Sequence, residues 1–434
     1  MSALKFNQKI FLDRVVLRPV ALFLNCIVRP VGILLNRNHD STASGVKTIV
    51  IAKLVGMGSI CRATPMIREI RNRYPDATIV VVTSCKNKII VERLNNINKV
   101  LYVDDLSISS TIVSSLKVLF RFWQLRVDLY FDLEVYSAYS TLLATLSLAR
   151  NRYGFYREST AFRLGLHTHL VYFNDNRNIS WIYMMLAKTC GAYSTNLKLD
   201  KPTISKDDIE KTQLFLTNAS GNYNSKYIVV NPNASELLTE RKWPGEYFAE
   251  LINVFSCVYA GTIYLIGSAD EFTCNAGIYE KLTEKSKKST HNIAGQLPFG
   301  QVLSLIENAQ CMLTNDSGLF HIALSLGTKT ISLWGPGNRT HYADYEYVNQ
   351  IALQNNDIYC SPCIYRVDKV PCRGNNKCMK SIHPLTVLNA LSTLCSISSD
   401  LFSTASLERV YKDVNAETLD ITMTSKRLQD AVTI

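Results

Sequence analysis

The sequence predicts an α/β protein with two doubly wound domains in tandem, preceded by an amphipathic helical extension. Short apolar runs alternate with helical patterns between residues 47 and 155 and again between 227 and 334, which indicates open parallel sheets. A polar stretch near residues 174–222, rich in Asn and Ser, separates the two series. Two such domains form a cleft at the ends of their strands, where ligands bind. We expect four segments: an extension and linker at 1–45, an N-terminal domain at 46–205, a C-terminal domain at 206–385, and a helical segment and tail at 386–434.

Composition and charge narrow the function classes. The 434 residues are 47% hydrophobic and 19% charged, as in a globular protein. The net charge of +11 lies within the first 100 residues, which hold 16 Lys and Arg against 5 Asp and Glu. This local basic character argues against a general nucleic-acid binder and favours a membrane surface or an acidic substrate, the alternative being an ordinary solvated face. We see no transmembrane run and no secretory signal, so we expect a cytoplasmic protein.

The first 40 residues predict a mostly apolar helix with a narrow polar stripe. Pro19 and Pro30 should kink or divide this helix. Such a helix suits the inner-membrane surface, where Arg pairs with lipid phosphates. The alternative is a helix that packs on the protein's own body or on a partner subunit. The stripe consists of residues that recur at spacings of four and seven: Arg14, Arg18, Asn25, Arg29 and Asn36.

The first domain begins with a buried strand from Lys47 to Ala52, and a glycine-rich turn leads from it into a helix that runs to Tyr74. The turn reads GxGxxR, with Arg62 where a dinucleotide fingerprint has its third glycine, so it does not favour NAD. Later strands and helices alternate regularly: a strand at 76–82, a strand at 100–103, a helix at 108–125, a strand at 129–133, a helix at 139–148 and a strand at 152–155. Asp132 lies in one of these strands, and Glu134 directly follows it.

The second domain contains the most informative stretch, between Cys311 and Pro336. A short strand runs into the polar turn 314–318, where Asp316 or Ser317 suits the N-cap of the following helix. Gly327 ends that helix, and another buried strand follows it. Free N–H groups, hydroxyls and the nearby His321 make this helix start a seat for a phosphate-bearing ligand. The alternative is an ordinary, well-capped β-α-β unit.

Several motifs together resemble the bacterial heptosyltransferase family, glycosyltransferase family 9. The resemblance covers about residues 46–385 and is most specific in the second domain. In the first domain it rests on Gly-Met-Gly-Ser-Ile from Gly56 and on Tyr74-Pro-Asp-Ala. The motifs of the second domain follow the family in order and spacing: Asn231-Pro-Asn-Ala, Arg241-Lys-Trp-Pro-Gly-Glu-Tyr-Phe, Ile293-Ala-Gly and Thr314-Asn-Asp-Ser-Gly-Leu-Phe-His.

The resemblance implies a GT-B fold and an inverting glycosyltransferase with no catalytic cofactor. The donor would be a nucleotide sugar such as an ADP-heptose, and the acceptor a lipopolysaccharide core, a lipid-linked or other surface glycan, or a protein. Lys242 and the helix start would stabilise the leaving diphosphate. Asp270 or Glu271 would bind the donor's ribose. The remaining donor residues implied are Thr314, Asn315, Asp316, Ser317, Gly318 and His321.

The acceptor side of the resemblance implies Gly58, Arg62 and Thr64 as binding residues. The basic side chains of Lys53, Arg62, Arg68, Arg71 and Arg73 would meet phosphorylated lipid-linked sugars.

The chain departs from the family at its general base. Many heptosyltransferases carry Gly-Asp in the N-terminal loop, and here the pair is Gly58-Ser59. An unassisted serine hydroxyl does not accept a proton at neutral pH, so Asp132, Glu134 or Asp105 would serve instead. The alternatives are a catalytically degenerate scaffold that acts in binding or assembly, and a different GT-B nucleotide-sugar enzyme.

Four of the twelve cysteines are clustered within 19 residues. Cys360, Cys363, Cys372 and Cys378 follow the pattern C-x2-C-x8-C-x5-C, which predicts tetrahedral thiolate ligation of a structural zinc or, alternatively, iron. A closed four-cysteine site would staple a loop and leave no open position for catalysis. Reduced thiols or two disulfides are the alternatives.

Overall fold

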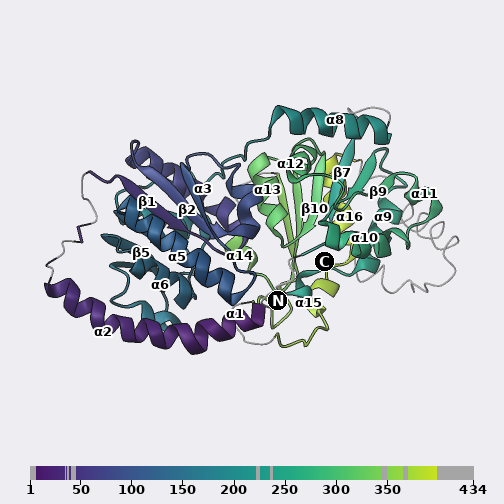
Figure 1. Cartoon of the computed structure of the whole chain (residues 1–434). Coiled ribbons are helices and arrows are strands. Elements are labelled where there is room, and N and C mark those ends of the chain that lie inside the picture. Colours follow the sequence, from purple (N-terminus) through teal and green to yellow (C-terminus); the bar gives the residue numbers. More distant parts are fainter. Residues whose placement is uncertain are drawn as a thin grey trace. The chain divides into compact units, whose positions relative to one another are not determined.

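The protein consists of two compact units, residues 1–203 (unit 1) and residues 204 onward (unit 2), each built on one six-stranded parallel sheet (Figure 1). The computed structural model describes residues 6–34, 36, 39–40, 45–220, 225–234, 238–343, 349–364 and 370–397.

The sheet of unit 1 has the order β3-β2-β1-β4-β5-β6, and all its neighbouring strands are parallel. The chain adds β2 and β3 on one side of β1 and then crosses to add β4 on the other side. The point between β1 and β4 is therefore the switch point of this sheet, where ligands of such folds bind. The strands are β1 (Thr48–Ala52), β2 (Thr78–Ser84), β3 (Lys99–Val103), β4 (Leu129–Asp132), β5 (Asn151–Tyr156) and β6 (His169–Tyr172).

Helices cover this sheet and bury its apolar strands. Residues near 174–222 were expected to form the passage between the domains, but they include α7 (Ile179–Lys188), which belongs to the core of unit 1. Its residues Ile182, Met184 and Leu186 are buried, and it packs on α3. The polar composition around α7 concealed this core helix. The helices of unit 1 after the extension are α3 (Met57–Arg73), α4 (Lys88–Val91), α5 (Ile108–Leu125), α6 (Ala138–Leu146) and α7 (Ile179–Lys188), with 3₁₀ turns η2 (Cys85–Asn87) and η3 (Glu158–Arg163).

The N-terminal extension forms α1 (Phe6–Leu12), the π-helical turn η1 (Asp13–Leu17) and α2 (Arg18–Leu34). The π turn absorbs the irregularity just before Pro19, which lacks a backbone N–H. Of the two predicted effects of Pro30, a kink or a division of the helix, the division does not occur, because α2 continues through Pro30. Among the described residues, none of the helices is both long and apolar enough to cross a membrane.

Unit 2 repeats the topology of unit 1, with the order β12-β11-β10-β7-β8-β9 and a switch point between β7 and β10. Its core includes Trp243 and Phe248, and α16 packs on α9 within it. The predicted tail beyond residue 397 lies outside the described residues. The strands are β7 (Tyr227–Asn231), β8 (Thr262–Leu265), β9 (Thr290–Asn292), β10 (Cys311–Asn315), β11 (Thr330–Trp334) and β12 (Gln350–Gln354).

The helices of unit 2 are α8 (Lys206–Ser220), α9 (Gly245–Phe255), α10 (Phe272–Tyr279), α11 (Glu284–Lys287), α12 (Phe299–Glu307), α13 (Gly318–Leu326), α14 (Arg339–Tyr342), α15 (Lys377–Lys380) and α16 (Pro384–Cys395), with 3₁₀ turns η4 (Thr239–Arg241) and η5 (Ala269–Glu271).

Candidate active site

A network of neutral polar side chains bridges the switch point of unit 2. Asn231, at the end of β7, donates hydrogen bonds to the hydroxyl oxygens of Thr314 (3.1 Å) and Ser317 (3.2 Å), and these two hydroxyls lie 3.0 Å apart. Asn315, at the end of β10, donates to the carbonyl of Pro232 (2.8 Å) and accepts from the backbone N–H of Trp243 (3.2 Å). The turn between β10 and α13 is thereby fixed from three sides.

This network leaves the start of α13 without a side-chain cap. Ser317 occupies the N-cap position, but its hydroxyl bonds to Thr314 and Asn231 and makes no capping hydrogen bond. The first N–H groups of a helix carry partial positive charge and have no partner within the helix. The arrangement therefore favours an anion at the β7/β10 switch point.

The structure assigns different roles to the predicted residues of this turn. Thr314 and Asn315 are fully buried, and their side chains hold the turn through the hydrogen bonds described above, so their role in donor binding stays a prediction. Ser317 and the backbone of Gly318 lie at the helix start. His321 is mostly buried one turn later, between the rings of Phe320 and Tyr342.

Asp316 is buried, and its negative charge is partly compensated by Arg241. Its carboxylate oxygen Oδ2 is 3.5 Å from Nε of Arg241 and packs against Gly337, where a Cβ atom would come within 2.2 Å of it. Only glycine leaves room for this carboxylate. Burial raises the pKa of Asp316, and the Arg241 guanidinium partly opposes that rise. Sequence reasoning assigned the basic role to Lys242 and missed Arg241, although the two residues are adjacent.

Lys242 is held beside the same turn by its backbone. Its carbonyl accepts a hydrogen bond from the side chain of Asn376 (2.8 Å), and the next residue, Trp243, donates its backbone N–H to Asn315. Trp243 is itself buried and donates its indole N–H to the carbonyl of Ile382 (2.8 Å). The lysine is therefore anchored to both the switch point and the C-terminal cysteine segment.

The two acidic residues predicted to bind ribose follow β8, the strand beside β7. Glu271 accepts the backbone N–H of Ser268 (2.8 Å) in a capping box, so its carboxylate already holds the turn η5. Asp270 is exposed at the same turn. Of the two, Asp270 is the carboxylate available for a ligand hydroxyl.

The switch point of unit 1 is built from charged groups. Glu134, just after β4, accepts hydrogen bonds through Oε1 from the backbone N–H groups of Leu54 (2.8 Å) and Val55 (2.9 Å), and from Lys53 Nζ (2.9 Å). These residues form the turn that leads from β1 into α3. The side chain of Glu134 is 14% exposed, so the carboxylate reaches the surface at the end of the sheet.

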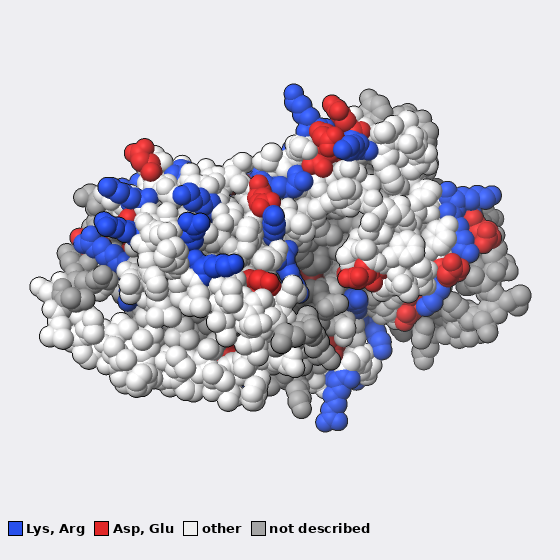
Figure 2. All heavy atoms as spheres, in the orientation of Figure 1, with Lys and Arg blue, Asp and Glu red and all other residues white. Residues whose placement is uncertain are grey.

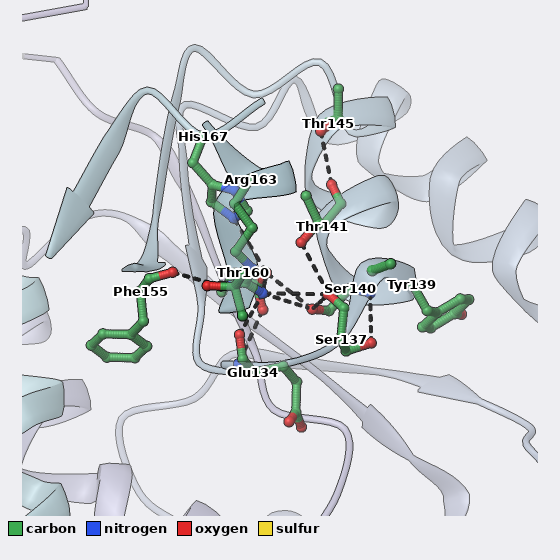
Figure 3. A network of polar contacts seen from close by, with 12 residues as sticks. Glu134, Ser137, Tyr139, Ser140, Thr141, Thr145, Phe155, Thr160, Arg163 and His167 are labelled. Carbon is green, nitrogen blue, oxygen red and sulfur yellow. Dashed lines mark hydrogen bonds and ion pairs between the residues drawn. The ribbon is translucent and has the colours of Figure 1, made fainter. Parts of the chain in front are cut away.

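Asp132 belongs to an ion-pair network with Arg163 and His167, whose side chains are labelled in Figure 3. Its Oδ2 accepts from Arg163 Nη2 (2.8 Å) and Ser140 Oγ (3.0 Å) and lies 3.2 Å from His167 Nε2. All three ionisable side chains are fully buried. Burial alone would raise the pKa of Asp132, but the Arg163 charge and the His167 hydrogen bond outweigh it and lower that pKa.

The network supports the loop that carries Glu134. Arg163 also donates to the carbonyl of Glu134 (2.5 Å), and Asp132 Oδ1 accepts the backbone N–H of Glu134 (3.1 Å). Burial lowers the pKa of His167 to about 4, so its ring is neutral at pH 7. A buried carboxylate with a lowered pKa is a poor proton acceptor, which argues against Asp132 as the general base. Sequence reasoning missed Arg163 and His167, because no local motif marks a contact made by the fold.

The predicted acceptor residues lie inside the fold. Arg62 is fully buried in α3, and Thr64, 2% exposed, donates its hydroxyl to the carbonyl of Cys61 and accepts the backbone N–H of Asp200. Gly58 is buried in the first turn of α3, next to Ser59. This burial gives no support to an acceptor contact by Arg62 or Thr64, and that contact stays a prediction.

Other basic residues of unit 1 are also engaged. Arg68 pairs with Asp200 and donates to the carbonyl of Lys198 (3.1 Å), while Arg71 donates to the carbonyls of Pro75 (2.9 Å) and Ala77 (2.7 Å). These arginines hold the loops around α3, so the predicted contact with acceptor phosphates finds no support in Arg68 or Arg71.

The four clustered cysteines line one cavity of about 440 Å³. Burial raises the pKa of Cys378 to about 11 and also raises the pKa of Cys363, and the other thiols of the cluster add to both shifts. Among the described residues no three ligating side chains are close enough to hold a metal as they stand. The donor set fits a four-thiolate metal in residue type, but its geometry is not assembled.

The segment that carries the cysteines packs against the loop that follows β11. Cys363 and Ile364 donate backbone N–H groups to the carbonyl of Pro336 (3.1 and 3.0 Å), and Ser361 donates to the carbonyl of Gly335 (2.6 Å). Pro336 directly precedes Gly337, which contacts Asp316. The cysteine segment thus supports the loops on both sides of Asp316, through Pro336 and through the contact of Asn376 with Lys242.

Comparison with known proteins identifies the family of the chain. Residues 67–373 match the model of glycosyltransferase family 9 (heptosyltransferase). The chain is 23% identical over 339 residues to a lipooligosaccharide heptosyltransferase 2 of Campylobacter jejuni, spanning 78% of this chain and 95% of that protein. With the same enzyme from a second strain it is 29% identical over 169 residues, which is 39% of this chain and about half (51%) of that protein.

Solved structures agree with the fold. A family 9 glycosyltransferase from Veillonella parvula superposes with a TM-score of 0.67 at 21% identity, over 81% of this chain and 98% of that one. The E. coli ADP-heptose lipopolysaccharide heptosyltransferase II superposes with a TM-score of 0.63 at 21% identity, over 80% and 98%. The expected GT-B fold is confirmed, and the chain belongs to glycosyltransferase family 9, the heptosyltransferase family, as a glycosyltransferase.

Proposed function

We propose that the protein is an inverting heptosyltransferase that moves a heptose, or a related sugar, from an ADP-heptose-like donor to a lipopolysaccharide core or another lipid-linked acceptor. The uncapped start of α13 at the β7/β10 switch point carries this proposal, because it offers free N–H groups to a diphosphate. The similarity to lipooligosaccharide heptosyltransferase 2 of C. jejuni supports heptose as the sugar and a surface glycan as the acceptor.

The donor would bind to unit 2, with its diphosphate at the helix start and beside Lys242. In the transfer step the bond between the anomeric carbon and the diphosphate oxygen breaks, and that oxygen keeps the electron pair. Negative charge therefore develops on the leaving group, where the partial positive charge of α13 and the Lys242 ammonium stabilise it. Asp270 would accept hydrogen bonds from the ribose hydroxyls.

The acceptor hydroxyl must lose its proton as its oxygen bonds to the anomeric carbon. Glu134 is the residue we assign to this role. Its Oε1 holds the turn after β1, and its Oε2 has no hydrogen bond among the described residues, so this oxygen remains to accept a proton. Ser59 lies at the start of α3, close in sequence to the same turn, and contributes no base of its own.

A structural metal on the cysteine segment is a further part of this proposal. Cys360, Cys363, Cys372 and Cys378 would hold zinc or iron and fix the loops that flank Asp316. A closed thiolate site supplies no catalytic position. Elemental analysis of the purified protein, with Cys360→Ser as the control, should give about one metal per chain in the wild type only.

The place of action would be the cytoplasmic face of the inner membrane, where lipid-linked acceptors are held. The N-terminal helix is the predicted contact, because its outer side chains are apolar and its charges mostly basic.

Calorimetric titration with ADP and nucleotide sugars tests the donor site. Wild-type protein should bind a nucleoside diphosphate, and Lys242→Ala should weaken that binding about tenfold, as expected for loss of one charge-assisted contact. Lys211→Ala, at an exposed ion pair on α8, is the matched control and should bind as the wild type does. Absence of binding of any nucleotide or nucleotide sugar by the wild type would contradict the proposal.

The serine at position 59 favours a second candidate, a scaffold that binds the donor without transfer. This candidate predicts that wild-type protein binds nucleotide sugars but releases no nucleoside diphosphate with any acceptor. Detection of turnover that depends on Glu134 would exclude it.

A further inference from the structure

We propose that unit 1 docks flat on an anionic membrane surface through an apolar face built from two helices, α2 and α5, and joined by the end of α6. The inference rests on the proposed function only in taking the membrane to be the one that holds the acceptor. We call this surface the apolar face, and it comprises the exposed side chains of Phe11, Val15, Val16, Val20, Leu22, Phe23, Ile27, Val31, Ile33 and Leu34 in the extension, Ile108, Ile112, Val113, Leu116, Phe120 and Trp123 in α5, and Leu146 and Leu148 at the end of α6.

A helix that only covers its own protein is expected to turn its apolar side inward. The extension instead leaves its large apolar side chains exposed. Two polar residues of its stripe face inward: Asn25 donates to the carbonyl of Leu164, and the Arg18 guanidinium lies 5.2 Å from the ring centroid of Phe162. Ala21, which lies between Arg18 and Asn25 in the sequence, is fully buried and packs with Leu166. The large apolar side chains on the outer side are 44–83% exposed. Water-exposed apolar surface on this scale indicates an interaction site.

The second helix of the face was not expected from the sequence. In α5 the buried side is Val118, Leu119 and Phe122, while Ile112, Leu116 and Phe120 lie on the outer side at a spacing of four residues and are each more than half exposed. This outer side repeats with helical periodicity, so it is a continuous stripe. A helix of a solitary globular protein normally carries polar residues there.

Direct hydrogen bonds join the extension to α5 through α6. Asp13 accepts the backbone N–H of Tyr139 (2.9 Å), whose hydroxyl lies 2.6 Å from the Ser115 hydroxyl on α5. At the other end of the face, Trp123 donates its indole N–H to the carbonyl of Leu146 (2.9 Å). The two helices therefore belong to one fixed surface and do not act as independent anchors.

The charges on this surface fit an anionic partner. Asp13 is the only acidic residue between positions 6 and 36, and its carboxylate faces inward, where it accepts Ser137 Oγ (3.0 Å) and backbone N–H groups at the start of α6. The charged residues of α5 are Lys117 and Arg121. Figure 2 shows few charged side chains over the lower part of unit 1, where Figure 1 draws α5, α6 and α2.

Lipid explains this face better than a second copy of the chain. A symmetric contact would enclose Lys117 and Arg121 of both copies in one interface to which α5 brings no acidic side chain, and like charges repel across an interface. Anionic headgroups instead pair with these cations, while the apolar side chains enter the acyl boundary. In unit 2 the described exposed large apolar residues are only Leu214, Phe272 and Tyr359, so the feature belongs to unit 1.

Vesicle flotation tests the proposal without any substrate. Wild-type protein should bind vesicles of phosphatidylglycerol and phosphatidylethanolamine and should bind phosphatidylcholine vesicles much less. Leu116→Glu combined with Phe120→Glu on α5 should reduce binding about tenfold, as should Phe23→Glu combined with Ile27→Glu on α2. Leu214→Glu, at an exposed apolar position of unit 2, is the control and should not change binding.

Fluorescence of Trp123 provides a test that needs no charged substitution. Vesicles with brominated acyl chains should quench it, and Trp123→Phe should lose most of the quenching, since Trp243 and Trp334 are buried and Trp181, which is 37% exposed, does not belong to the apolar face. Wild-type binding by the α5 double variant, or absence of quenching, would overturn the two-helix face. A second result would also overturn it: wild-type protein that does not bind vesicles but forms a dimer in light scattering, where the α5 double variant is a monomer. ADP titration of each variant reports separately on the proposed function.

Discussion

The two switch points share one topology and differ in chemistry. In unit 2 the strands β7 and β10 are bridged by amides and hydroxyls, those of Asn231, Thr314 and Ser317, and the helix that follows begins without a side-chain cap. In unit 1 the strands β1 and β4 are bridged by charges, with Glu134 on the backbone of the β1 turn. Neutral hydrogen-bond donors suit a ligand that is itself negatively charged. A carboxylate suits a ligand hydroxyl that must lose a proton.

The difference also appears in what supports each site. Beneath Glu134 lies the fully buried network of Asp132, Arg163 and His167, which fixes the loop from inside the core. The switch point of unit 2, where we propose that the donor binds, is supported from the cysteine segment through Asn376 and the backbone of Cys363. Unit 1 therefore depends on buried charge for its geometry, and unit 2 depends on a peripheral loop.

The largest effect is expected from Glu134→Gln. The amide keeps an oxygen for the N–H groups of Leu54 and Val55 but does not accept a proton, so turnover should fall about 10²- to 10⁴-fold. Release of nucleoside diphosphate measured with a competent acceptor checks this. Asp105→Asn, at the other candidate carboxylate, serves as the comparison and should retain most activity. Full activity in Glu134→Gln would show that the base lies elsewhere.

Asp132→Asn should destabilise unit 1 strongly. The substitution leaves the Arg163 charge buried without its partner, which costs about 3–5 kcal/mol in comparable pairs. Denaturant unfolding followed by circular dichroism gives the change in free energy of unfolding. Asp207→Asn breaks an exposed pair with Lys211 on α8 and should leave that free energy unchanged. Equal stability of both variants would contradict the structural role of the network.

Acid should weaken unit 1 through His167. Its pKa falls from 6.5 to about 4 on folding because burial disfavours the charged ring. The unfolded chain then binds more protons between these values, so stability should decrease as pH drops from 6.5 to 4, by about 3 kcal/mol. Asp132, whose pKa is also lowered, adds a further loss only below the usual carboxyl range. In His167→Gln the free energy of unfolding should change less between pH 6.5 and pH 4 than it does in the wild type. The same pH dependence in both proteins would contradict the role of His167.

A smaller effect is expected at the turn of unit 2. Ser317→Ala removes the hydroxyl that Asn231 and Thr314 share, so the start of α13 is held less firmly and the donor Kd should rise about fivefold. Ser325→Ala, which removes a buried hydroxyl from the far end of the same helix, is the matched control for calorimetry. If both variants lose affinity equally, the turn has no special role.

Local patterns in the sequence predicted much of the fold and part of the site. The alternation of buried strands and helices indicated both sheets, and the turn around Ser317 was identified from its capping residues. Periodicity did not show which face of the N-terminal helix packs inward, because both directions give the same spacing. It also did not show that Arg62 is buried or that Arg163 pairs with Asp132, since these contacts join residues far apart in the sequence.

Donor titration of two variants under the same conditions tests the division of roles between the switch points most directly. Glu134→Gln should bind ADP or an ADP-sugar with the wild-type Kd although its turnover is lost, because its carboxylate acts on the acceptor. Lys242→Ala should raise that Kd about tenfold. If Glu134→Gln loses donor affinity as much as Lys242→Ala does, or if neither variant changes it, the assignment of donor and base to separate switch points is contradicted.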